Sequence, residues 1–231
     1  GREVLRAENL GLITDQGAFS GSGRAEGETQ KRRLDETYAL PGGKKAVYEA
    51  HANEMTLTYP AGGVCFKLIV RVYDDGVAFR FALEGEANLK IIRETTSFRL
   101  APGMTETWLQ DWIESYEGLF NPLPWAETEG RHFGMPCLFH GADEPWVLIS
   151  EANVYNAGGS YCASHLVGSA DRRMSLTFAP EQKEPIAACL PFVSPWRAAI
   201  IASDTAQLTE STLICNLNPP SALEDTSWVK P

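Results

Sequence analysis

Alternation of apolar and polar side chains with a period of two residues is the feature that most constrains the fold. Residues 55–59 read Met-Thr-Leu-Thr-Tyr, and two longer apolar-rich segments, 66–73 and 77–83, flank an Asp-Asp-Gly sequence at 74–76. A strand with one buried face shows this period, and a glycine after two aspartates favours a tight turn that accepts positive φ. The sequence therefore predicts a β-hairpin over residues 66–83.

Strands are expected along most of the chain, and helices are expected to be few and short. The other predicted strands are 89–94, 97–100, 146–151, 174–178, 187–192 and 197–202. One short helix is predicted at 205–209, with Ser203 or Asp204 as its N-cap, and a second within 111–120. Many strands without intervening helices predict an all-β antiparallel sandwich.

Size and charge narrow the class of protein. A chain of 231 residues is long enough for one large all-β domain with a substantial core. The formal net charge of −10 disfavours a nucleic-acid partner, and it suits a neutral ligand such as a sugar as well as it suits solubility alone. No apolar run reaches the roughly 18 residues that a membrane-spanning helix needs.

The cysteines predict neither a disulfide framework nor a zinc site. There are five of them, and none forms a CxxC pair: Cys65, Cys137, Cys162, Cys189 and Cys215. An odd, dispersed set in apolar contexts is typical of buried thiols. This pattern leans toward a reducing compartment such as the cytoplasm, while a periplasmic or secreted location stays open.

Three residues are candidates for function. Glu151 ends an apolar strand, which places its carboxylate at the rim of a sheet. Trp108 and Trp125 could border a saccharide cleft, because indole faces stack on sugar rings; core packing or a domain interface is the competing interpretation. No phosphate-binding loop, serine nucleophile elbow or Cys-His signature is present, so no catalytic residue is assigned.

The end of the chain resembles a known family. Residues 213–231, with Asn-Leu-Asn-Pro-Pro followed by Asp-Thr-Ser-Trp-Val-Lys-Pro, resemble the end of the amino-terminal domain of glycoside hydrolase family 97. Other stretches resemble that domain in the same order: Asn-Leu-Gly-Leu at 9–12, Asp-Gly-Val-Ala-Phe-Arg-Phe at 75–81, Ser-Tyr-Glu at 115–117 and Ser-Pro-Trp-Arg at 194–197.

The resemblance implies an organisation that the strand pattern alone does not. Residues 1–218 would form a β-super-sandwich similar to galactose mutarotase, without the family's first strands. Residues 219–231 would be a linker to a catalytic (β/α)₈ barrel that this chain lacks. The parent would hydrolyse α-glucosides or α-galactosides, the barrel and an oligosaccharide substrate would be the partners, and the chain alone would be inactive.

The resemblance also implies a metal. Ile-Ser-Glu-Ala at 149–152 resembles the family's Ile-Thr-Glu-Ala motif, whose glutamate is one ligand of a calcium ion beside the substrate. Calcium takes about 6–8 oxygen ligands, so Glu151 would need others from the barrel. Two alternatives stay open: a free-standing carbohydrate-binding module and, behind it, a sugar epimerase of mutarotase type. The sequence chooses neither glucose over galactose nor inversion over retention.

Overall fold

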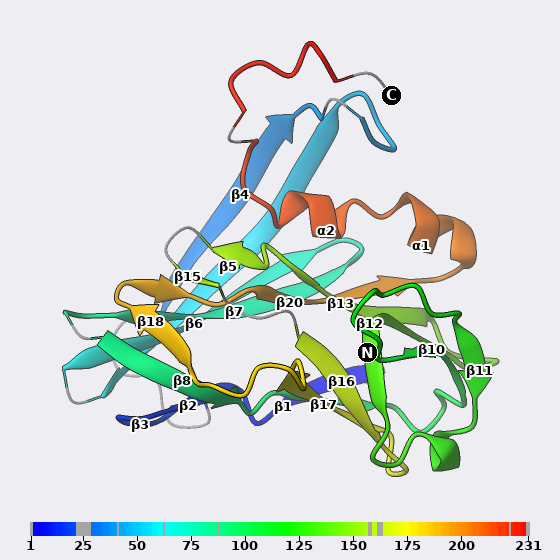
Figure 1. The fold of residues 1–231 in the computed structure, drawn as a ribbon. Coiled ribbons are helices and arrows are strands. Elements are labelled where there is room, and N and C mark those ends of the chain that lie inside the picture. The colour runs from blue at the N-terminus through cyan, green and yellow to red at the C-terminus, as the bar shows by residue number, and fades with distance from the viewer. Residues whose placement is uncertain are drawn as a thin grey trace.

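The structure is a computed structural model, and it describes residues 2–21, 29–40, 42–61, 63–86, 88–156, 159–160, 164–221 and 223–229. Within these residues the strands pair antiparallel and form two packed sheets, which confirms the predicted all-β sandwich (Figure 1). Among the described residues, no helix is long and apolar enough to cross a membrane. Four of the cysteines have free thiols, and Cys162 lies outside the described residues.

The larger sheet has 14 strands in the described part of the chain. Its main path, in spatial order, is β1 (Leu5–Glu8), β9 (Ser97–Leu100), β17 (Arg173–Phe178), β16 (Ser164–Ser169), β12 (His132–His140), β13 (Trp146–Ala152), β20 (Trp196–Ala202), β7 (Gly76–Glu84), β6 (Val64–Tyr73), β5 (Tyr48–Ala61) and β4 (Gln30–Tyr38). Three short strands join this path: β10 (Glu106–Asp111) on β12, β11 (Asn121–Leu123) on β10 and β19 (Phe192–Val193) on β7.

The smaller sheet has four strands in the order β18 (Ile186–Cys189), β8 (Asn88–Glu94), β2 (Gly11–Thr14) and β3 (Gly17–Ser20). A separate pair consists of β14 (Tyr155–Asn156) and β15 (Gly159–Ser160). Helices α1 (Thr205–Glu210) and α2 (Leu213–Asn216) lie on the side of the larger sheet that faces away from the smaller one (Figure 1). The fold is therefore a sandwich with one outer face partly covered by helix.

The predicted hairpin is confirmed, but its glycine has a different role. Tyr73 pairs with Gly76, so the turn consists of Asp74 and Asp75 alone, and Gly76 has no positive φ. A Cβ at Gly76 would lie 2.3 Å from the carbonyl oxygen of Ala199. The glycine is needed because β20 passes close to β7, which is a contact between distant parts of the chain.

One predicted helix is confirmed and the other is wrong. Helix α1 begins after Asp204, whose Oδ1 accepts a hydrogen bond from the Gln207 backbone N–H at 2.8 Å. The segment 111–120 has no helix; β10 ends at Asp111 and a loop follows, with Tyr116 at a φ of 54°. The indole of Trp112 packs on His165 and the ring of Tyr116 packs on Trp112, so tertiary packing overrides the local preference.

The predicted strand 187–192 divides into two strands that belong to different layers. Strand β18 pairs with β8 in the smaller sheet, and β19 pairs with β7 in the larger one. The segment therefore crosses from one sheet to the other. Periodicity cannot show such a crossing, because each piece keeps the alternation of a strand.

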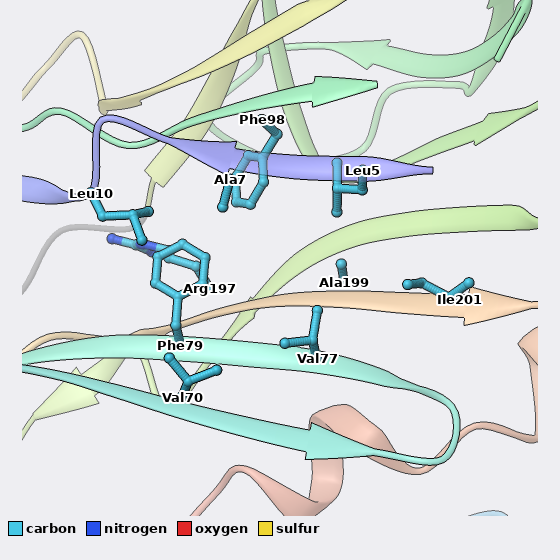
Figure 2. A pocket seen from close by; sticks show the side chains of 10 residues that line it. All are labelled: Leu5, Ala7, Leu10, Val70, Val77, Phe79, Phe98, Arg197, Ala199 and Ile201. Carbon is cyan, nitrogen blue, oxygen red and sulfur yellow. The ribbon is translucent and has the colours of Figure 1, made fainter. Parts of the chain in front are cut away.

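Alternation along β20 divides its side chains between two environments. Trp196, Ala198 and Ile200 pack in the apolar cluster under α1 and α2. Arg197, Ala199 and Ile201 point into the sandwich and line a cavity of about 250 Å³ between β1 and strands β6, β7 and β20 (Figure 2). The rest of that cavity is apolar, so Arg197 brings a charge into the interior of the sandwich.

Candidate functional site

Glu151 lies at the end of β13 and directly opposite Arg197 of β20. It follows Val147 and Ile149 on the same face of the strand, and both of these are fully buried in the core between the sheets. The carboxylate of Glu151 is 10% exposed at the rim where that core ends. This confirms the strand and its end, and it shows that the carboxylate is directed to the inner side of the sheet.

Arg197 links two carboxylates. Its Nη1 donates to Oε2 of Glu151 at 2.6 Å, and its Nη2 donates to Oε2 of Glu94 at 2.7 Å. Glu94 is the last residue of β8, so the arginine of the larger sheet reaches across to the smaller sheet. One guanidinium therefore bonds to a carboxylate of each sheet.

The carboxylate of Glu151 has a further partner and an altered acidity. The backbone N–H of Ser164 donates to Oε1 of Glu151 at 3.1 Å. Burial raises the pKa of the Glu151 carboxyl above its ordinary value, and the charge of Arg197 and the bonds from Ser164 oppose that rise. A bound cation would favour the ionised form, since it adds positive charge at the rim.

An aromatic and histidine cluster adjoins this carboxylate; it consists of Trp112, Tyr116, His132 and His165. His165 is fully buried next to Ser164, with Trp112 stacked on its ring at a centroid distance of 4.5 Å. Nδ1 of His132 lies 2.6 Å from Nε2 of His165. Burial first, and then the charge of His132, lowers the pKa of His165 to about 4.

Tyr116 connects the cluster to the rim. Its ring meets Trp112 edge to face at 5.0 Å, and a Cβ at Gly134 would lie 3.3 Å from its Cε1. Burial, followed by the negative charge of Glu151, raises the pKa of Tyr116 to about 12. A phenol with this pKa stays neutral near pH 7 and is able to donate a hydrogen bond to a ligand at the rim.

The two candidate tryptophans have different environments. Trp108 on β10 is 36% exposed, and its indole is accessible from solvent. Trp125 is 7% exposed, its Nε1 donates to the Met104 carbonyl at 2.7 Å, and its ring stacks on Phe139. Trp125 therefore packs in the core, and no sugar ring reaches its face in this structure.

Glu94, His165 and the role of Arg197 at this site were not predicted from the sequence. Arg197 is a single charged residue in the apolar strand Trp-Arg-Ala-Ala-Ile-Ile-Ala, and such a residue indicates a buried ion pair. Its partner Glu94 is 103 residues away in the sequence, a separation that no local pattern bridges. Among the described residues, no three His, Cys, Asp or Glu side chains group closely enough to hold a metal ion.

Comparison with known proteins now defines the class to which this domain belongs. Residues 1–220 match the family model described as Glycosyl-hydrolase 97 N-terminal. The chain therefore belongs to the family of amino-terminal domains of glycoside hydrolase family 97.

Two curated relatives cover the whole of this chain. A probable retaining alpha-galactosidase of Streptomyces bingchenggensis is 32% identical, and a retaining alpha-galactosidase of Bacteroides thetaiotaomicron is 22% identical. The chain spans 35% and 39% of their respective lengths. Both relatives therefore contain a large additional part to which nothing in this chain corresponds.

Two solved structures share the fold. A glycoside hydrolase family 97 enzyme from Pseudoalteromonas sp. strain K8, in complex with acarbose, is 26% identical with a TM-score of 0.85; the match covers 99% of this chain and 35% of that enzyme. A beta-arabinopyranosidase is also 26% identical, with a TM-score of 0.80; the match covers 92% of this chain and 37% of that one.

Proposed function

We propose that this chain is the non-catalytic amino-terminal sandwich of a larger glycoside hydrolase that acts on α-galactosides or α-glucosides. It packs on the catalytic barrel, and Glu151 contributes one oxygen to a calcium ion beside the sugar site. Residues 1–218 form the sandwich in this proposal, and 219–231 lead to the barrel. Both curated relatives are named as alpha-galactosidases, which favours galactosides as the substrate. Glucosides are kept as the second candidate substrate because one solved relative is in complex with acarbose.

One observation carries the calcium proposal: the Glu151 side chain stands at the rim at the end of β13, where it is 10% exposed and is held from the interior side by Arg197 at 2.6 Å. Hard carboxylate oxygens are the ligands that calcium prefers. The residues present fit one ligand position and no more, because this chain offers no further acidic cluster within its described residues. The remaining ligands belong to the barrel in this proposal.

Calorimetry with calcium chloride tests the role of Glu151. We expect the isolated chain to bind calcium no more tightly than the millimolar range, and we expect Glu151→Gln to weaken calcium binding by the longer enzyme at least about tenfold. Glu210→Gln, an exposed substitution on α1, is the matched control and should change nothing. Submillimolar binding by the isolated chain, or unchanged binding by the Glu151→Gln enzyme, would contradict the proposal.

Trp108 gives a specific reason to keep the second candidate function, a carbohydrate-binding module. Its indole is exposed, and Ile113 and Phe120 are exposed further along the same part of the chain. Saturable binding of malto- or galacto-oligosaccharides by the isolated chain, lost in Trp108→Ala, would favour this function. A flat isotherm would leave the exposed apolar side chains as a surface for the barrel.

A further inference from the structure

An apolar groove runs along β1 on the inner side of the sandwich. Its first part is the cavity of about 250 Å³ between β1 and strands β6, β7 and β20. Leu5 and Ala7 of β1 line this cavity from one side, and Val70, Val77 and Phe79 line it from the other (Figure 2). Of these five side chains only Phe79 is buried and the others are half-buried, so solvent reaches part of the apolar lining.

The groove continues over the inner face of β5 and β6. A second hollow, of about 530 Å³, shares Val70 with the cavity and is also lined by Asn53, Met55 and Val72, while Glu54 and charged residues of β4 border it. Met55 pairs with Val70 and Asn53 pairs with Val72, so the four side chains lie on one face of the sheet. Val72 is 50% exposed, which leaves the apolar floor of this hollow in contact with water.

The backbone of β1 has one free edge. Among the described strands, β1 pairs with β9 alone and ends the larger sheet on that side. The Val4 carbonyl accepts a hydrogen bond from the Ala101 N–H at 3.0 Å, in register with the pairing of Leu5 and Leu100. Hydrogen-bonded pairs alternate along an antiparallel ladder, so Leu5 and Ala7 direct their N–H and C=O groups away from β9. The strand that lines the groove can therefore pair with a further strand.

We propose that this groove holds an extended segment of the parent polypeptide, which pairs with β1 as an additional strand of the larger sheet. Backbone hydrogen bonds to Leu5 and Ala7 hold the added strand in register. Every second side chain of a strand points to the same face, so apolar side chains of the added strand fill the space over Val70 and Val72. The inference rests on the proposed function in one respect only, which is that this chain is part of a longer enzyme.

The parent polypeptide suits this position better than a second copy of the chain. This chain spans 35% and 39% of its two curated relatives, so the remaining length of such an enzyme can supply a strand. A strand within the same polypeptide also binds at a high effective concentration. A second copy that paired through its own β1 would bring only Leu5 and Ala7 of that strand to the inner side, and these two side chains are too small to fill both hollows.

Thiol labelling of Val72→Cys with a maleimide tests whether the groove is covered in the longer enzyme. We expect labelling at least about tenfold slower in the longer enzyme than in the isolated chain, because an occupied groove is exposed only by local unfolding. Ile92→Cys is the matched control: Ile92 is 48% exposed on β8 of the smaller sheet, and its labelling rate should be similar in both proteins. Peptide mass mapping separates each new cysteine from the native ones. Equal rates for Val72→Cys in the two proteins would overturn the proposal.

Hydrogen exchange over β1 distinguishes a paired strand from any other cover. The amides of Leu5 and Ala7 should exchange at least about tenfold more slowly in the longer enzyme than in the isolated chain. A protected Val72→Cys thiol with unprotected β1 amides would overturn the proposal, because the cover would then not be a strand. Labelling of the isolated chain that slows as its concentration rises would also overturn it, in favour of a second copy. Unchanged calcium binding by the Glu151→Gln enzyme would contradict the calcium role and leave both measurements unaffected.

Discussion

At the scale of single residues, Arg197 determines more of the site than the glutamate that the sequence analysis identified. Its side chain is 1% exposed, and it is held between a fully buried Glu94 and a rim carboxylate on Glu151. A buried ion pair contributes little beyond a well-packed apolar pair, but the loss of one partner leaves an uncompensated charge in the interior. The carboxylate of Glu151 is therefore positioned by a residue that is itself almost fully buried.

Replacement of Arg197 by methionine should lower the free energy of unfolding by about 3–5 kcal/mol, because two carboxylates then lose their shared cation. Urea unfolding followed by fluorescence measures the change. Arg131→Met is the control: its ion pair with Asp111 is exposed, and its loss should cost less than about 1 kcal/mol. A similar small effect for Arg197→Met would contradict this account, and adding Glu94→Leu to Arg197→Met should recover part of the loss.

Among the elements, the strands with strong alternation were the predictable part. The hairpin of β6 and β7, strand β9 and strand β13 are found where the period of two places them, because that period records burial of one face and needs no knowledge of the neighbours. The N-cap of α1 is equally local, since Asp204 binds the backbone three residues later.

Elements whose form depends on distant contacts could not be predicted in this way. The segment after Asp111 is a loop because Trp112 packs on His165, which is more than fifty residues later in the chain. The pairing of β1 with β9 and of β2 with β8 likewise joins remote segments. The same limit applies to the candidate site. The strand end at Glu151 could be predicted from the sequence, but the ion pairs of the site could not, because the other partners lie on β8 and β20.

We expect the contact between β12 and β16 through two histidines to make the fold sensitive to acid. The pKa of His165 is about 4 when folded, below the ordinary value of about 6.5, so between these values the unfolded chain binds a proton that the folded chain does not. Stability should therefore fall as the pH falls through this window, by up to about 1.4 kcal/mol per pH unit from this residue.

Urea unfolding at several pH values between 4 and 7 measures this slope. In His165→Phe, which keeps an aromatic ring against Trp112, the slope should be shallower by up to the same amount. His51→Gln is the control, because His51 is exposed and its partner Asp35 is exposed as well. An unchanged slope in His165→Phe would show that the histidine pair does not cause the acid sensitivity.

At the scale of the whole molecule, we expect no hydrolysis of aryl α-galactosides or α-glucosides by this chain alone. A glycosidase needs two carboxyl groups on opposite sides of the scissile bond. Glu94 and Glu151 are bound to one arginine, and Glu94 is fully buried, so they cannot flank a sugar. Release of nitrophenol measures the activity, with the full-length enzyme as the positive control. Steady turnover by the purified chain would overturn the assignment of catalysis to the barrel.

The chain of contacts from Glu94 through Arg197 to Glu151 joins the two layers of the sandwich at the carboxylate that is proposed to bind calcium. A cation that drew the Glu151 carboxylate outward would compete with Arg197 for Oε2. It would thereby weaken a chain of contacts that also holds the two sheets together. If Glu151 binds calcium as proposed, metal affinity and the rigidity of the scaffold would oppose each other in this domain. Variants selected for tighter metal binding would have a weaker contact between the two sheets unless a second substitution restored it.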